Sequence, residues 1–268
     1  MSSPWIAAAI AVIAWWVSTG AILFAVHRAD DRGPAARRAI VLLSAPIALI
    51  GFLMVRASLD QMTTTNVYMS FFGALLVWGW IELSFLTGYV TGPNQRPLDA
   101  RSPSRGRFIQ AVQAVAFHEL LLLAGLVTLI AMSAQSENRI GMACFLILFL
   151  ARVMAKLNLF FGVPRINTEF IPSALTHLTS YFRQGPITFA FPVAITVLTA
   201  LLAVCAERLM SAQSDVTVVG FGLLTALTAL ALLEHWLMVV PLPDAKLWRW
   251  LLPPSPAIPE EESKTHGF

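Results

Sequence analysis

The sequence predicts an all-α integral membrane protein, a polytopic bundle of about seven transmembrane helices. Of its 268 residues, 57% are hydrophobic and 12% are charged, whereas a soluble domain carries about 25% charged residues. The mean hydropathy is +0.71, and the apolar residues occur in long blocks. A bilayer can cover this much apolar surface, because a helix satisfies its own backbone hydrogen bonds in lipid.

Seven apolar blocks are long enough to cross a hydrocarbon core of about 30 Å, which takes roughly 20 helical residues. The predicted spans are residues 4–26, 39–59, 67–90, 108–132, 140–161, 187–206 and 216–240. The first block has no Lys or Arg before it and is longer than the apolar core of a signal peptide, so we expect a retained helix. Residues 1–240 then form one transmembrane domain, and residues 241–268 a flexible cytoplasmic tail.

Polar and turn-forming residues separate these blocks. Residues 27–38 hold four arginines and Gly33-Pro34, and residues 91–107 are rich in Pro, Gly, Ser and Arg. Residues 162–186 are mixed, and apolar enough to lie on a membrane surface. We expect the chain to leave the membrane at these three connectors.

The distribution of positive charge predicts the orientation. The first, third and fifth connectors and the tail carry thirteen of the 18 Lys and Arg residues, and the opposite side carries three. Because cytoplasmic loops are enriched in Lys and Arg, we expect the N-terminus in the periplasm and the C-terminus in the cytoplasm.

Ionisable residues lie inside the predicted spans, where each costs roughly 2.5–3.5 kcal/mol on insertion scales. Counted along their helices at about 1.5 Å per residue, all of them fall in the cytoplasmic half of the membrane. This predicted buried polar layer consists of Glu82, His118, Glu119, Arg152, Lys156, Glu234 and His235.

Arg152 and Lys156 are four residues apart, so they share one face of their helix and require anions nearby. We therefore expect Arg152 to pair with Glu82 or Glu119. A structural network of ion pairs, a binding site for a polar or metal-bearing ligand, and a proton or ion path are all compatible with the layer. His118 and His235 are also candidate axial ligands of a pigment or haem, but lone histidines in helices are more often structural. We predict no catalytic residue and no protein metal site, because no cluster with the spacing of metal ligands is present.

The segment after the fifth span departs from the composition of a lipid-facing helix. Gly162 and Pro164 should end the span, and Asn167 or Thr168 should cap a short helix that follows. We expect this segment to dock to a partner, since aromatic side chains dominate many interfaces. The candidate docking residues are Gly162, Pro164, Asn167, Glu169, Phe170, Tyr181 and Phe182.

The chain resembles the PuhE type of photosynthetic complex assembly protein from purple phototrophic bacteria. The likeness rests on Trp16-Val17-Ser18-Thr19-Gly20, Phe160-Phe161-Gly162-Val163-Pro164, Asn167-Thr168-Glu169-Phe170 and Ser180-Tyr181-Phe182, and on length and layout. The resemblance implies a helper in forming the reaction-centre and core light-harvesting complex, with an influence on bacteriochlorophyll supply. It also implies a bacterial inner membrane, cytoplasmic or intracytoplasmic, as the location, and it brings no catalytic residues.

The expected function is thus that of a non-enzymatic assembly factor. Its expected partners are membrane proteins of the photosynthetic core complex or of pigment synthesis, together with the lipid bilayer, and no nucleic acid. The cofactor stays open, with bacteriochlorophyll as one candidate. The alternative is a small-solute or ion transporter that uses the intramembrane Glu, His and Arg side chains, although we find no repeat or paired broken helices. A membrane enzyme acting on lipid or pigment is the third reading.

Overall fold

A computed structural model of the protein describes residues 3–99, 101, 103–169 and 171–241. Seven helices in this part of the chain are long and apolar enough to cross a membrane, and no strand is present in it. The spans are α1 (Pro4–Asp30), α2 (Pro34–Ala57), α3 (Thr64–Leu86), α4 (Ser104–Ser133), α5 (Ile140–Phe161), α6 (Ala190–Met210) and α7 (Asp215–Leu237). The predicted all-helical membrane fold is therefore confirmed.

Each predicted span corresponds to one of these helices, and the ends differ by a few residues. The third span ends at Leu86 rather than at residue 90, because Gly88 adopts a φ of 74° and turns the chain out of the helix. The fourth begins at Ser104, four residues before the apolar block, so its first turn carries Arg105 and Arg107. The predicted tail, apart from Pro241, lies outside the described residues.

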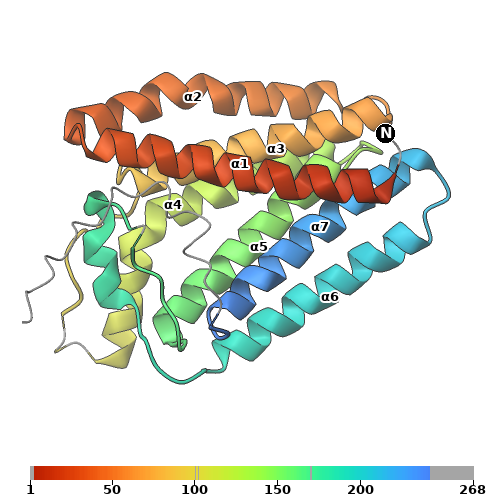
Figure 1. Ribbon diagram of the computed structural model, residues 1–268. Coiled ribbons are helices and arrows are strands. Elements are labelled where there is room, and N and C mark those ends of the chain that lie inside the picture. The colour runs from red at the N-terminus through yellow and green to blue at the C-terminus, as the bar shows by residue number, and fades with distance from the viewer. Residues whose placement is uncertain (1–2, 100, 102, 170, 242–268) are drawn as a thin grey trace, which may run out of the picture.

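Helices α3, α5 and α7 form the centre of the bundle, with α1 and α2 along one side and α6 along another (Figure 1). α3 is the most deeply buried span. The main core holds large side chains from these central helices and from α4, among them Phe71, Leu122, Leu129, Phe145, Leu223 and Leu227. Apolar side chains elsewhere on α1, α2 and α4 remain exposed on the bundle surface, as expected for helices that face lipid.

Small residues bring α2 close to α3. A Cβ atom on Gly51 would lie 2.6 Å from the carbonyl oxygen of Gly73, and one on Gly73 would lie 2.7 Å from that of Gly51. Close backbone approach at glycine is a common way for membrane helices to gain packing contacts. Since only a small part of α2 is buried, this contact is a main anchor of the helix.

The connections gather at two ends of the bundle. The described parts of residues 31–33, 87–103 and 162–189 lie at one end, which we call the connector-rich end (Figure 1). The start of α1 and the α6–α7 connection lie at the other end (Figure 1). Residues 173–181 and the start of α4 lie at the connector-rich end. This arrangement is the one that seven antiparallel spans require.

The α5–α6 connector contains a short 3₁₀ helix, η1 (Ser173–Tyr181). The prediction that Asn167 or Thr168 caps this helix is wrong, because the residue before η1 is Pro172. Asn167 instead accepts a hydrogen bond from the backbone N–H of Glu169 and forms a local turn. The leucines at helical spacing, Leu175 and Leu178, pack inward against α3 and α4 in a second small core.

We predict that Gly51→Ala destabilises the protein by about 1–3 kcal/mol, the usual cost of overpacking. The new methyl group would meet backbone atoms of α3, which cannot move aside cheaply. Gly79→Ala is the control, because its nearest neighbour is a side-chain atom of Ile22 at 3.5 Å. Thermal unfolding in detergent measures both variants, and equal melting temperatures would contradict the packing account.

Reporter fusions test the orientation. The side of the membrane with most of the Lys and Arg residues should be the cytoplasmic one. Reporters inserted in residues 91–107 or fused after Phe268 should therefore be cytoplasmic. Reporters near Met1 and in residues 133–138 should be periplasmic. A reporter pattern with both termini on one side would contradict seven spans.

Candidate functional site

A buried ion pair joins α3 to α5. Arg152 Nη2 donates to Glu82 Oε2 at 2.7 Å, and the Glu82 side chain is 3% exposed. The prediction that Arg152 pairs with Glu82 or Glu119 is confirmed, and the partner is Glu82. The other carboxylate oxygen of Glu82 faces His118 Nε2 of α4 at 3.6 Å. Three helices therefore meet at one carboxylate.

His118 is fully buried at this junction. Its ring packs on Phe85 with 4.2 Å between ring centroids, and neither ring nitrogen has a hydrogen-bond partner among the described residues. The backbone N–H of His118 donates to the carbonyl of Thr91 in the α3–α4 connector. Gly92, which follows Thr91 in the chain, must be glycine, because a Cβ atom there would lie 2.0 Å from the carbonyl oxygen of Gln113.

A second ion pair lies beside the first. Lys156 of α5 donates to the carboxylate of Glu119 of α4. Both cations of α5 also lie near the ring of Phe85, with Arg152 Cζ 5.8 Å and Lys156 Nζ 5.3 Å from its centroid. These are cation–π distances, so Phe85 contacts both cations and His118 at once.

The remaining members of the predicted layer lie on α7 and belong to other contacts. His235 is buried, and its Nδ1 lies 2.8 Å from the carbonyl oxygen of Ala231. Glu234 is on the exposed face of α7, where Trp15 of α1 hydrogen-bonds to it. None of the ion pairs between described residues includes Glu234. The predicted layer of seven thus contains one cluster of five, made by α3, α4 and α5.

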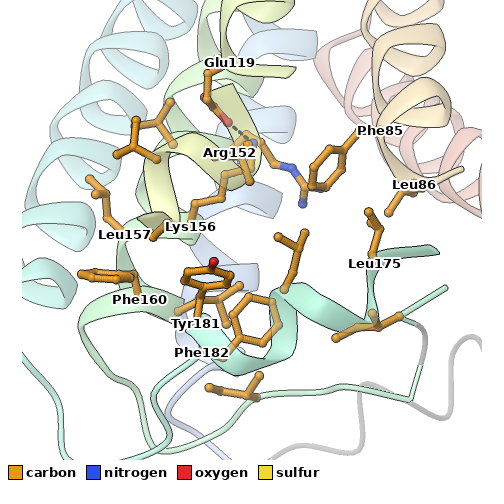
Figure 2. A pocket seen from close by; sticks show the side chains of 18 of the residues that line it. Phe85, Leu86, Glu119, Arg152, Lys156, Leu157, Phe160, Leu175, Tyr181 and Phe182 are labelled. Carbon is orange, nitrogen blue, oxygen red and sulfur yellow. Dashed lines mark hydrogen bonds and ion pairs between the residues drawn. The ribbon is translucent and has the colours of Figure 1, made fainter. Parts of the chain in front are cut away.

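A pocket of about 410 Å³ opens next to this cluster, between α4, α5 and the α5–α6 connector (Figure 2). Arg152, Lys156 and Glu119 line its polar part. Most of the wall is apolar, with side chains from the end of α3, from α4 and α5, and from η1; examples are Phe85, Phe108, Val112, Phe160, Leu175 and Phe182. Glu82, His118, Glu234 and His235 are not among the lining residues. His118 is therefore not presented to the pocket as an axial ligand.

Tyr181 holds η1 over the pocket. Its hydroxyl donates to the carbonyl of Arg96 and accepts a hydrogen bond from the side-chain amide of Asn94. Burial raises the pKa of the Tyr181 phenol above its usual value, against the opposing effect of the Asn94 hydrogen bond. The phenol thus remains a neutral donor, and it fixes the end of η1 to the α3–α4 connector.

A carboxylate at the end of α1 holds the other end of η1. Asp30 accepts hydrogen bonds from the backbone N–H and the hydroxyl of Ser173, and from Arg37 of α2 at 2.6 Å. Ala174 approaches Gly88 so closely that a Cβ atom on the glycine would lie 2.6 Å from its methyl carbon. η1 is therefore fastened to α1, α2 and the end of α3.

The predicted docking residues differ in their exposure. Tyr181 is 4% exposed, so it is not available as a surface anchor, and Phe182 is half-buried and lines the pocket. Gly162 is buried at the end of α5, with a φ of 132°, and Pro164 is half-buried. Asn167 and Glu169 are exposed. Phe170 lies outside the described residues.

Sequence reasoning missed three parts of this site. It did not find the role of Phe85, because a phenylalanine in an apolar span carries no pattern that marks a cation contact. It did not find the link between Asp30 and Ser173, which are far apart in the chain. It also passed over Asn158, a fully buried residue of α5 whose side-chain amide has no partner among the described residues. The signal for Asn158 was present as a lone polar amide within an apolar span.

The described residues contain no group of three or more His, Cys, Asp or Glu side chains arranged to hold a metal ion. The charged groups of the site can offer ion pairs and hydrogen bonds to a ligand. Two cations, two carboxylates and one imidazole lie against an apolar pocket, in surroundings where water is scarce and charged groups interact strongly.

We predict that Arg152→Leu lowers the free energy of unfolding by about 3–5 kcal/mol, because it leaves the buried Glu82 charge without its partner. Adding Glu82→Gln should restore part of the loss. Adding Glu119→Gln to Arg152→Leu is the matched control, and it should restore nothing, since Glu119 pairs with Lys156. Membrane abundance and thermal unfolding are measured for the wild type, the single variant and the two double variants. Equal rescue by Glu82→Gln and Glu119→Gln would refute the pairing of Arg152 with Glu82.

Comparison with known proteins assigns the family. The family described as "Protein of unknown function (DUF3623)" matches residues 1–258. A relative from Rhodobacter capsulatus, named "Uncharacterized 30.4 kDa protein in puhA 5'region", is 46% identical over 253 residues, which cover 94% of this chain and 92% of the relative. No solved structure matches the chain significantly. With nearly its whole length matched, the chain belongs to the DUF3623 family.

Proposed function

We propose that this protein is a membrane factor that assists assembly of the photosynthetic reaction-centre and core light-harvesting complex, with an influence on bacteriochlorophyll supply. It acts from a bacterial inner membrane, with its N-terminus in the periplasm and its connector-rich end in the cytoplasm. Its role is to bind and position other components rather than to turn over a substrate.

The observation that carries this proposal is the printed name of the relative, which locates it in the 5' region of puhA. The resemblance to the PuhE type of assembly protein rests on separate features, the motifs of the first span and of residues 160–182. The name of the relative and the name of the resembled family share the Puh root. Identity of 46% over nearly the full length supports a shared role for the two proteins.

The structure supports binding at the connector-rich end. η1 and the α5–α6 connector are fixed by hydrogen bonds to α1 and to the α3–α4 connector, so this end presents a defined surface. Its exposed residues include Asn167, Glu169, Arg183 and Gln184. We propose this outer face, in place of the buried Tyr181, as the contact with proteins of the core complex or of pigment synthesis.

The contacts of the buried charges favour an assembly factor over the alternative transporter. The charged residues of the cluster are held in ion pairs. The lining of the described pocket stops at Glu119 and Arg152, and beyond them buried core residues such as Leu122 and Phe145 fill the bundle. The described pocket thus lies near one end of the bundle and does not cross it.

Deletion of the gene in a phototrophic host should lower the absorbance of the core complex, and a plasmid copy should restore it. In the plasmid copy, Glu169→Arg should leave the protein abundant, because the side chain is exposed, and should still lower core-complex absorbance by reversing a charge on the proposed contact. Absorption spectra of membranes at matched protein levels measure the effect.

The matched control is Glu137→Arg, a reversal of an exposed glutamate at the opposite end of the bundle. It should complement fully. A normal core complex in the deletion strain would reject the proposed function, and equal complementation by the two variants would reject this contact surface only.

A further inference from the structure

The pocket beside the ion pairs has the properties of a ligand site. Its volume, about 410 Å³, lies within the range of about 300–1,000 Å³ that is usual for small-molecule pockets. Phe108 and Val112 line it and are 41% and 47% exposed, so the pocket opens at the bundle surface beside α4. A molecule dissolved in the membrane can reach it from there.

The charged groups of the cluster balance as two ion pairs, but they do not face the pocket equally. Arg152 and Lys156 line it as cations, and Glu119 is the carboxylate that lines it. Glu82 is 3% exposed and lies behind Arg152, outside the lining. The positive end of the Arg152–Glu82 ion pair therefore points toward the pocket. A negative group on a ligand would lie closer to Arg152 than to Glu82 and would be attracted by this end of the pair.

The two cations also retain hydrogen-bond donors. Arg152 Nε is buried and has no hydrogen-bond partner among the described residues, because the Glu82 carboxylate is engaged through Nη2. Lys156 has three N–H groups, and the hydrogen bond that it donates goes to Glu119. A buried donor without a partner costs free energy, which an acceptor on a ligand would recover.

Opposite this polar part the wall is apolar and aromatic. Phe160 and Phe182 face the cavity together with Leu175 (Figure 2). Such a wall binds hydrocarbon by the hydrophobic effect. The pocket therefore combines a small cationic end with a larger apolar body.

We propose that this pocket binds an amphiphile with a hydrocarbon body and one carboxylate group, whose carboxylate is held by Arg152 and Lys156. Arginine favours carboxylates because its planar N–H groups match their two oxygens. A phosphate dianion fits less well, since it would bring two negative charges close to Glu119 into a cluster whose own charges already balance. This inference goes beyond the proposed function and does not depend on it.

The test uses the purified full-length protein in nanodiscs of zwitterionic lipid, with a diazirine-bearing palmitic acid as the probe. Labelled peptides, identified by mass spectrometry, should come from α4, α5 and residues 162–182. Oleate should compete for labelling about tenfold more strongly than methyl oleate, a difference that corresponds to roughly 1.4 kcal/mol. Equal competition by the ester would overturn the role of the carboxylate, and stronger competition by a lysophosphatidic acid would overturn the choice of carboxylate over phosphate.

Two variants locate the site. Val112→Trp fills the pocket from an exposed position and should abolish labelling, whereas Val127→Trp, at an exposed position of α4 outside the pocket, should not. Lys156→Met should reduce the preference for oleate over its ester while labelling continues, because Arg152 remains. If Lys156→Met fails to fold, the Val112 and Val127 pair still decides, and unchanged labelling of Val112→Trp would overturn the site.

Discussion

The ion pair between Glu82 and Arg152 is the interaction on which this bundle depends most. Separated from water, each charge would be costly in a membrane, and the pair lowers this cost only while α3 and α5 keep their register. His118 of α4 lies against the same carboxylate, so the third helix is positioned by it as well. Apolar packing alone does not specify which helices meet, because lipid tails offer apolar contacts as well. A buried polar contact of this kind does specify the arrangement of the helices.

The pocket follows from this arrangement. Because Glu82 is deep in the bundle, Arg152 reaches inward to it and passes the ring of Phe85. Lys156, one turn further along α5, then meets Glu119 nearer the connector-rich end. Space remains between these side chains and η1. The hydrogen bonds of Tyr181 and the link from Asp30 to Ser173 fix the position of η1 and so keep this space open. The same charges that hold the helices in place thus form the polar end of a pocket.

Much of the fold was predictable, because apolar blocks of membrane length report directly on spanning helices. The sequence also predicted that Arg152 requires a carboxylate, since an unpaired cation in lipid is costly. It did not distinguish Glu82 from Glu119, because that choice depends on the rotation of three helices. Tyr181 was expected on the surface from its place in a connector, whereas it turns inward to the carbonyl of Arg96. Glu234 was counted with the cluster from its depth alone, and depth does not determine which face of α7 it occupies.

The central claim, that Glu82 and Arg152 form the ion pair that joins α3 to α5, is tested most directly by solid-state NMR in lipid membranes. Protein labelled with ¹³C in glutamate side chains and ¹⁵N in arginine side chains should show a strong dipolar contact between a carboxylate carbon and a guanidinium nitrogen, as the 2.7 Å distance from Nη2 to Oε2 requires. Glu207 also lies near an arginine, Arg208, at 3.5 Å, so all variants carry Glu207→Gln to remove that signal. In this background the contact should be absent from Glu82→Gln and present in Glu119→Gln. A wild-type spectrum without it, or a contact that persists in Glu82→Gln, would contradict the account.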